Sequence, residues 1–185
     1  MLSFRLRLKV KRYYQQLAHY NQWINKRVYS SAGKLNQQAL SENRGAYFGS
    51  IIGTLNHILV GDIFWFKRFA NHPANYQSLE YFRSVKKPAS LDELSELSEL
   101  SELSEAREHT DSAIMQFISE LTDEVIVSTL KYTNSKGQKF NKNMGDLLLH
   151  VFNHQTHHRG QVSTLLYQAG IDVGVTDMVV GIADK

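Results

Sequence analysis

The chain has 185 residues, with 21 Lys and Arg, 18 Asp and Glu and a formal net charge of +3. This length suits one domain built on a single hydrophobic core. Because the sequence contains no cysteine, disulfides, thiolate metal sites and a cysteine nucleophile are excluded. The sequence has neither the roughly 20 consecutive apolar residues of a membrane span nor the apolar segment of a signal peptide. We therefore expect a soluble, cytoplasmic protein with no membrane partner.

Basic residues are concentrated at the start of the chain. Arg5, Arg7, Lys9, Lys11 and Arg12 carry five positive charges with no acid among them, so residues 13–185 are weakly acidic. A nucleic-acid-binding protein would spread its basic charge over a folded face, so nucleic acid is not an expected partner. We interpret residues 1–12 as a basic N-terminal extension and residues 13–185 as the folded domain.

The first half of the chain predicts two helices. The first is indicated by apolar residues at helical spacing and ends before Gly33; these residues are Tyr13, Leu17, Tyr20, Ile24 and Val28. The second helix runs from Ser50 to Phe69 and is dense in Ile, Leu and Phe. Residues 71–89 contain two Pro and two Asn, which predicts a loop.

A third helix is predicted from Ser90, where a Ser-x-x-Glu capping box with Glu93 favours a helix start, to Ile118 or Leu121. This segment includes four consecutive Leu-Ser-Glu units over residues 94–105. A period of three does not line one helix face, and acidic runs usually face water. We interpret the repeat as a solvated helix lengthened by duplication.

The last third of the chain predicts a hairpin and a fourth helix. Residues 125–132 alternate like a strand, and the turn residues 134–137 follow them. The fourth helix extends from about Asn143 to Ala169 and ends at Gly170. The predicted fold class is therefore all-α, a four-helix bundle with a short hairpin inserted before the last helix.

Four of the eight histidines lie close together in the fourth helix; they are His150, His154, His157 and His158. Two imidazoles at i, i+4 project from one helix face and can reach one metal ion. A helical wheel places His154 and His158 at the edge of the buried arc and the other two nearer solvent. The alternative is a pair of core histidines whose hydrogen bonds are satisfied by neighbours.

A metal site of this kind needs a third protein ligand. The remaining histidines, His19, His57, His72 and His109, are all candidates. The wheel places His57 away from the main apolar arc of its helix, on a side that it shares with Gly61. The sequence pattern alone leaves the third ligand open.

The run from Asn153 to Gln161, Asn-His-Gln-Thr-His-His-Arg-Gly-Gln, resembles the hallmark of the DinB/YfiT-like superfamily, which is distinct from the DNA polymerase of similar name. The resemblance extends from Tyr13 to Asp177 and includes further motifs; these are Tyr20 to Asn25, Ser50, Thr54 to Leu59, Asp62, Trp65, Gly137 and Gly170. It implies a divalent metal held by His57, His154 and His158 in a four-helix bundle, and a homodimer. It also implies a low-molecular-weight thiol cosubstrate, as in S-transferases and thiol-dependent isomerases.

A three-imidazole site suits zinc or nickel, and its open positions can activate a thiol or a water molecule. Asp62 is the one acid that we consider as a catalytic base, although it is equally suited to pairing with Arg159. Arg159 and Gln161 are candidates for orienting a ligand or supporting the imidazoles. We expect a metal-dependent, thiol-using S-transferase acting on a small molecule. The alternatives are a non-catalytic, stress-induced metal-binding bundle and a metal-dependent hydrolase, whereas the Glu-x-x-His pairs of a di-iron bundle are absent.

Overall fold

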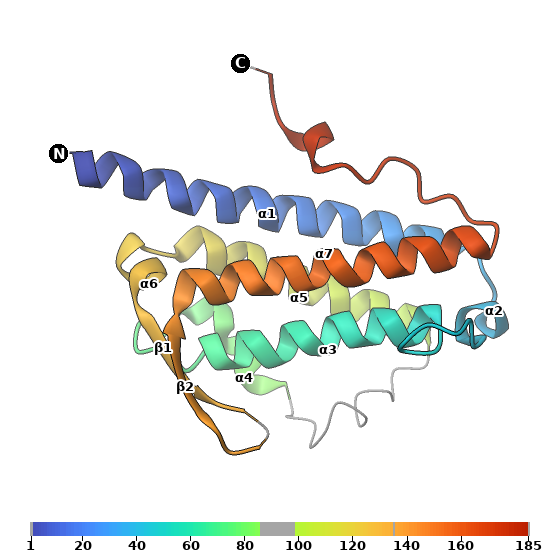
Figure 1. Cartoon of the computed structure of the whole chain (residues 1–185), viewed down its shortest axis with the longest axis horizontal. Helices are drawn as coiled ribbons and strands as arrows, with labels where there is room; N and C mark the ends of the chain where they lie inside the picture. Colours follow the sequence, from blue (N-terminus) through green and yellow to red (C-terminus); the bar gives the residue numbers. More distant parts are fainter. Residues whose placement is uncertain (1, 86–98, 135, 185) are drawn as a thin grey trace.

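Four long helices form the body of the protein (Figure 1). The computed structural model describes residues 2–85, 99–134 and 136–184. The long helices are α1 (Leu2–Ala32), α3 (Ile51–Phe69), α5 (Leu100–Glu120) and α7 (Met144–Gln168). Shorter elements connect them; these are α2 (Gln37–Ser41), the 3-10 turn η1 (Gln77–Leu79), α4 (Glu80–Ser84), α6 (Asp123–Val127) and a 3-10 turn at Met178–Gly181. The predicted all-α bundle is confirmed.

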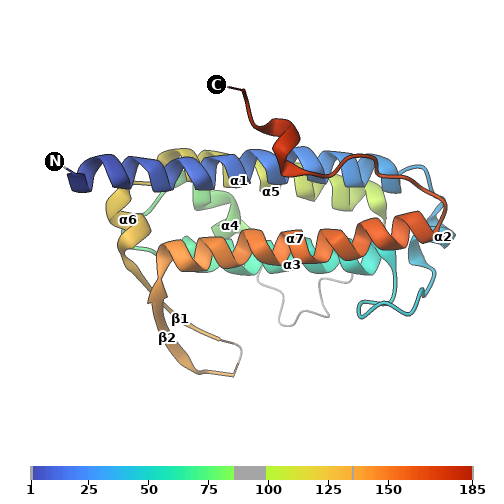
Figure 2. The ribbon, with the colours of Figure 1, turned by 45° about the horizontal axis from the view of Figure 1, so that its top comes forward.

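The helices are arranged so that α1 and α3 each pack against both α5 and α7. Figures 1 and 2 show α1 and α7 running in one direction and α3 and α5 in the other. A two-stranded hairpin of β1 (Thr129–Thr133) and β2 (Lys139–Asn143) precedes α7, with Thr129 opposite Asn143. The predicted hairpin is therefore confirmed. None of the described helices is long and apolar enough to cross a bilayer.

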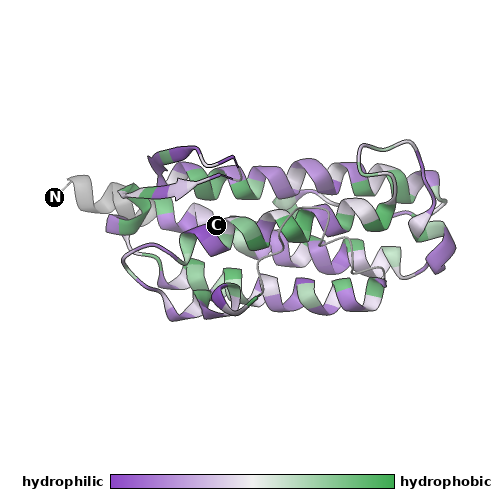
Figure 3. Cartoon of the chain, turned by 90° about the horizontal axis from the view of Figure 1, so that it is seen from below, coloured by the Kyte–Doolittle hydropathy of each residue, from purple (hydrophilic) through white to green (hydrophobic). Residues whose placement is uncertain are grey.

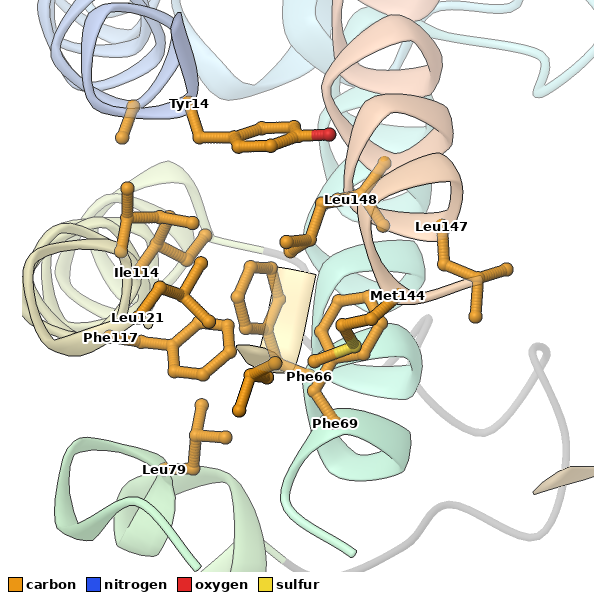
Figure 4. Close-up of a cluster of buried hydrophobic side chains, with 14 of the residues drawn as sticks. Tyr14, Phe66, Phe69, Leu79, Ile114, Phe117, Leu121, Met144, Leu147 and Leu148 are labelled. Carbon is orange, nitrogen blue, oxygen red and sulfur yellow. The ribbon is translucent and has the colours of Figure 1, made fainter. Parts of the chain in front are cut away.

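Two apolar clusters and a polar layer between them make up the interior. One cluster lies toward the hairpin and contains Phe66, Phe117 and Met144 (Figure 4). The other lies toward α2 and contains Leu55 and Leu166. Between them each long helix contributes buried polar groups; these are Asn21, Asn25, Asp62, Arg107, Asp111, Gln155 and Arg159. Apolar and polar residues alternate around each helix, as Figure 3 shows, because only one side of each faces this interior.

Local sequence signals define several of the helix ends. The Ser50 side chain accepts a hydrogen bond from the Gly53 amide at 3.0 Å and caps α3. Asn143 caps α7 in the same way through the Asp146 amide, also at 3.0 Å. Gly170 follows α7 with φ of 80°, which a side-chain-bearing residue rarely adopts. The second and fourth predicted helices therefore have nearly the expected limits.

Other predicted boundaries were wrong. Helix α1 begins at Leu2, so the basic segment is the first part of a helix that continues into the bundle. Within the predicted loop, η1 and α4 bury Leu79 and Phe82 completely. Residues 125–127 belong to α6, which Thr122 caps, rather than to a strand.

The predicted third helix is described only from Glu99 onward. Helix α5 begins at Leu100, and Glu99 is its N-cap. The proposed capping box of Ser90 and Glu93 and the first part of the Leu-Ser-Glu repeat lie outside the described residues. In the described part of the repeat Leu103 is buried in the core, whereas Glu102 and Glu105 are exposed. The acidic side chains of this part therefore face water, as predicted.

Candidate metal centre

Three histidines converge where α3 and α7 pack against each other. His57 comes from α3, and His154 and His158 lie one turn apart on α7. One ring nitrogen from each residue lies within 4.8 Å of the other two. The Nε2 atoms of His57 and His154 are 3.2 Å apart. The structure thus brings together the three residues that the family resemblance indicated.

The spacing of two of these nitrogens matches that of two ligands on one metal ion. Zinc–imidazole bonds are about 2.0–2.1 Å long, so two nitrogens on a tetrahedral zinc lie about 3.3 Å apart. The 3.2 Å separation of the Nε2 atoms of His57 and His154 agrees with that value. The ring centroids of His57 and His154 both lie 4.5 Å from that of His158. The three imidazoles therefore suit one divalent cation, with positions left open for another ligand.

The site also favours neutral imidazoles, the form that binds metal. Burial and, to a smaller extent, the charge of His158 together lower the pKa of His57 to about 4. Burial likewise lowers the pKa of His154 to about 4, with a further contribution from His158 and His57. Both rings are therefore unprotonated at neutral pH, and their lone pairs are available to a cation.

Gln161 fixes the orientation of the His158 ring. Its side-chain Oε1 lies 2.7 Å from His158 Nδ1. Because an amide oxygen can only accept, the imidazole must donate from Nδ1, which leaves its Nε2 lone pair free. Metal-binding histidines usually donate their second ring nitrogen in this way. This contact is the supporting role that the sequence analysis considered for Gln161.

Two further residues shape the site. Phe48, in the loop before α3, stacks on the His57 ring with centroids 3.8 Å apart and contacts His158 edge-on at 5.4 Å. Gly61 lies against His154, because a Cβ at this position would be 2.8 Å from the imidazole Cε1. The helical wheel predicts that Gly61 shares a side of its helix with His57, whereas Phe48 was not predicted. The only available signal for Phe48 was a Tyr-Phe pair between Gly45 and Gly49, both of which have positive φ.

Asp62 and Arg159 point into the polar layer of the bundle. Asp62 is fully buried and pairs with Arg107 of α5 at 2.5 Å. Burial raises the pKa of Asp62, and the charge of Arg107 opposes that shift. Arg159 donates hydrogen bonds to the side-chain oxygens of Asn21 and Asn25. Asp62 thus forms an ion pair with Arg107, and its carboxylate lies in the bundle interior.

The other histidines lie outside the cluster of three, although the ring of His157 contacts that of His158 edge-on at 4.8 Å. His19, His109 and His157 are exposed. The Nε2 atom of His72 is 2.9 Å from the Ser128 hydroxyl, outside the cluster. The His150 ring is 6.2 Å from that of His154, one turn toward the hairpin. Of the four candidates for the third ligand, the structure therefore selects His57, which is the one that lies with His154 and His158.

Comparison with known proteins places the chain in one family. The model of the DinB family matches residues 8–183. Protein DinB of Bacillus subtilis (strain 168) is 24% identical over 162 residues, which cover 88% of this chain and 89% of that protein. No solved structure is significantly similar to the chain. The match over nearly the whole length confirms the predicted resemblance, and the chain belongs to the DinB family.

Proposed function

We propose that His57, His154 and His158 bind one zinc or nickel ion, and that the protein uses it to transfer a low-molecular-weight thiol to a small electrophile. The observation that carries the proposal is the convergence of three ring nitrogens within 4.8 Å on a pair of antiparallel helices. A bound divalent ion would supply Lewis acidity and lower the pKa of a thiol at an open position. Since the chain has no cysteine, the thiol must enter as a cosubstrate.

The residues of the chain would hold the reactants and limit access of water. The three imidazoles would fix the cation between α3 and α7, and Gln161 would keep the His158 proton on Nδ1. Phe48 covers one side of the cluster with an apolar ring, which reduces the access of water to the bound thiol. These roles need no general base from the protein, because a metal-bound thiol loses its proton at neutral pH.

A hydrolase is less well supported by the site. Metal-dependent hydrolysis commonly uses a carboxylate that accepts a proton from the metal-bound water. Asp62, the acid considered for this role, is fully buried and paired with Arg107. A non-catalytic metal-binding protein needs the same three histidines. Only an activity measurement distinguishes this function from that of a transferase.

The first experiment measures metal binding. Zinc and nickel are titrated by calorimetry into the wild type, into His57→Ala, His154→Ala and His158→Ala, and into the control His157→Ala, an exposed histidine on the same helix. We expect one ion per chain in the wild type and control, and an affinity loss of about 100-fold or more in each ligand variant. Tight binding by His154→Ala would refute the site.

The second experiment measures turnover. The metal-loaded protein is tested with a panel of small thiols and a chromogenic electrophile. Conjugation that requires both metal and thiol, and that is lost in His154→Ala but retained in His157→Ala, supports the transferase. Metal binding without any conjugation supports the non-catalytic alternative instead.

We further propose that the protein is a homodimer, as the family resemblance implies. Apolar side chains near the C-terminus are compatible with a protein interface, since Val179 and Val180 are 68% and 61% exposed. Light scattering on the full chain should give twice the monomer mass, and a monomer mass at micromolar concentration would refute the proposal.

A further inference from the structure

The surface that carries the three histidines continues along α3 and α7 toward the hairpin. The ring of His150 lies 6.2 Å from that of His154, and the ring of Trp65 lies 5.1 Å from that of His150. Tyr132 of β1 follows, 5.5 Å from Trp65. Figure 1 shows the hairpin at the end of the bundle where α3 ends and α7 begins. A continuous row of rings thus links the candidate metal centre to the hairpin.

Positive charge accompanies this row of rings. The guanidinium of Arg68 lies over the faces of Trp65 and Tyr132, at 4.5 and 4.9 Å from the ring centroids. Lys142 belongs to β2, and its ammonium lies over the Phe140 ring, 5.5 Å from the centroid. Burial lowers the pKa of His150, and the positive charges of Lys142 and Arg68 lower it further. Arg68 and Lys142 therefore both lie close enough to His150 to affect its charge, and His150 is next to the metal-ligand cluster.

The guanidinium of Arg68 is half-buried and lacks a carboxylate. Among the described residues, neither Arg68 nor Lys142 forms an ion pair. Burial lowers the pKa of Arg68, and only Tyr132 opposes that shift. Its faces lie against aromatic rings, so its N–H edge is the part left to bind an anion. A partly desolvated guanidinium of this kind binds planar or tetrahedral oxyanions through two parallel hydrogen bonds.

A purely structural role for these residues explains only part of the arrangement. The cation–π contacts of Arg68 can fasten the hairpin to α3. That role does not need Lys142 or His150, which are both exposed. It also does not account for the composition of residues 129–143, which include four Lys and no Asp or Glu. A hairpin with this excess of positive charge creates a positive local potential, which attracts anions.

We propose that Arg68, Lys142 and His150, with Trp65 and Tyr132 as walls, bind an oxyanion group of the substrate. The substrate class is then a small organic anion, either a carboxylate or a phosphate, whose electrophilic atom lies near the three histidines. Two ring contacts, of 5.1 and 6.2 Å, connect Trp65 through His150 to His154, so the oxyanion group would be held beside the metal-ligand cluster. This inference rests on the proposed function for its catalytic meaning, but anion binding itself can be measured without metal.

The test uses the full chain, metal-free and zinc-loaded. The chain has two Trp residues, so a Trp23→Phe background leaves Trp65 as the sole tryptophan reporter. Benzoate and inorganic phosphate are titrated separately at constant ionic strength while Trp65 fluorescence is followed. Saturable binding of benzoate supports a carboxylate substrate, and saturable binding of phosphate alone supports a phosphorylated one. Saturation by neither anion overturns the inference.

Three variants locate the binding site. Arg68→Gln and Lys142→Gln should each weaken anion binding about tenfold or more, the usual loss of a charge-assisted hydrogen bond. Lys136→Gln removes the same charge at the hairpin turn and should leave binding unchanged. If Arg68→Gln loosens the hairpin, Lys142→Gln still tests the inference, because Lys142 is exposed and its replacement should not disturb the fold. Equal affinity in all three variants overturns the inference.

The outcome is distinguishable from a failure of the proposed function. Zinc affinity should be the same in Arg68→Gln and Lys142→Gln as in the wild type, since neither residue is a ligand. If the wild type binds no metal but still binds benzoate through Arg68, the proposed function fails and the anion site stands. If benzoate binds only to the zinc-loaded chain and is insensitive to Arg68 and Lys142, the anion is a metal ligand and the inference is refuted.

Discussion

Replacing Gly61 with Ala tests the position of His154 without changing a metal ligand. A Cβ at residue 61 would lie 2.8 Å from Cε1 of His154, whereas ordinary van der Waals contact of a Cβ begins at 3.4 Å. The imidazole must therefore retreat by about 0.6 Å, because packed interiors offer little slack. Metal–ligand distances tolerate deviations of about 0.2 Å. The added methyl group should thus pull one ligand out of range of a shared ion.

The expected effect is on metal affinity much more than on folding. We expect zinc to bind about 10–100-fold more weakly to Gly61→Ala, the loss typical of disturbing the residues that position a ligand. In the metal-free protein, Ala gains up to about 1 kcal/mol of helix propensity over Gly, which offsets part of the crowding. Zinc calorimetry gives the affinity, and urea unfolding with and without zinc gives the stability.

Gly160 supplies the matched control. It lies in α7, and a Cβ there would have nothing within 4 Å. Gly160→Ala should therefore stabilise the metal-free protein by about 0.5–1 kcal/mol and leave zinc affinity unchanged. If Gly61→Ala binds zinc as tightly as Gly160→Ala does, the contact between α3 and His154 does not position the ligand, and the reasoning is wrong.

Three further predictions concern the site and the charges beneath it. Phe48→Ala removes the ring stacked on His57 and should weaken zinc binding about tenfold in calorimetry; unchanged affinity would contradict this. The pKa values of His57 and His154 are lowered from 6.5 to about 4, so between these pH values the unfolded chain binds more protons than the metal-free native protein. Urea unfolding should therefore show stability falling as the pH is lowered from about 6.5 to about 4, less steeply in His154→Ala; a flat profile would be inconsistent. Asp62→Asn removes one charge partner of buried Arg107 and should cost about 3 kcal/mol of unfolding free energy; a loss within the usual surface range of about 0.5 kcal/mol would refute the pairing argument.

The elements that the sequence predicted well have ends determined by local chemistry. Ser50 and Asn143 cap their own helices, and Gly170 adopts the positive φ that ends α7. Such signals need only neighbours within four residues. Residues 125–127 were misjudged because tertiary packing overrides their strand-like alternation: Val125 and Ile126 are adjacent, yet both are buried, as a short helix allows.

The site was only partly predictable for a related reason. His154 and His158 share one helix, so spacing and the wheel were enough to select them. His57 lies on the side of α3 away from the main apolar arc, and its partner His154 is 97 residues later in the chain. A wheel shows that such a side exists but does not show which helix covers it. Phe48 lies in a loop, where no periodicity applies, and only the fold brings it to the cluster.

The orientation of the metal ligands depends on the opposite side of α7. His158 faces α3, whereas the next residue, Arg159, is buried and bonds to Asn21 and Asn25 of α1. Those asparagines also donate to Asp111 of α5. Any rotation of α7 that moved His158 away from α3 would pull the guanidinium of Arg159 from its partners, which costs several kcal/mol for a buried charge. The buried polar layer therefore fixes the rotation of α7, and with it the direction in which the imidazoles point.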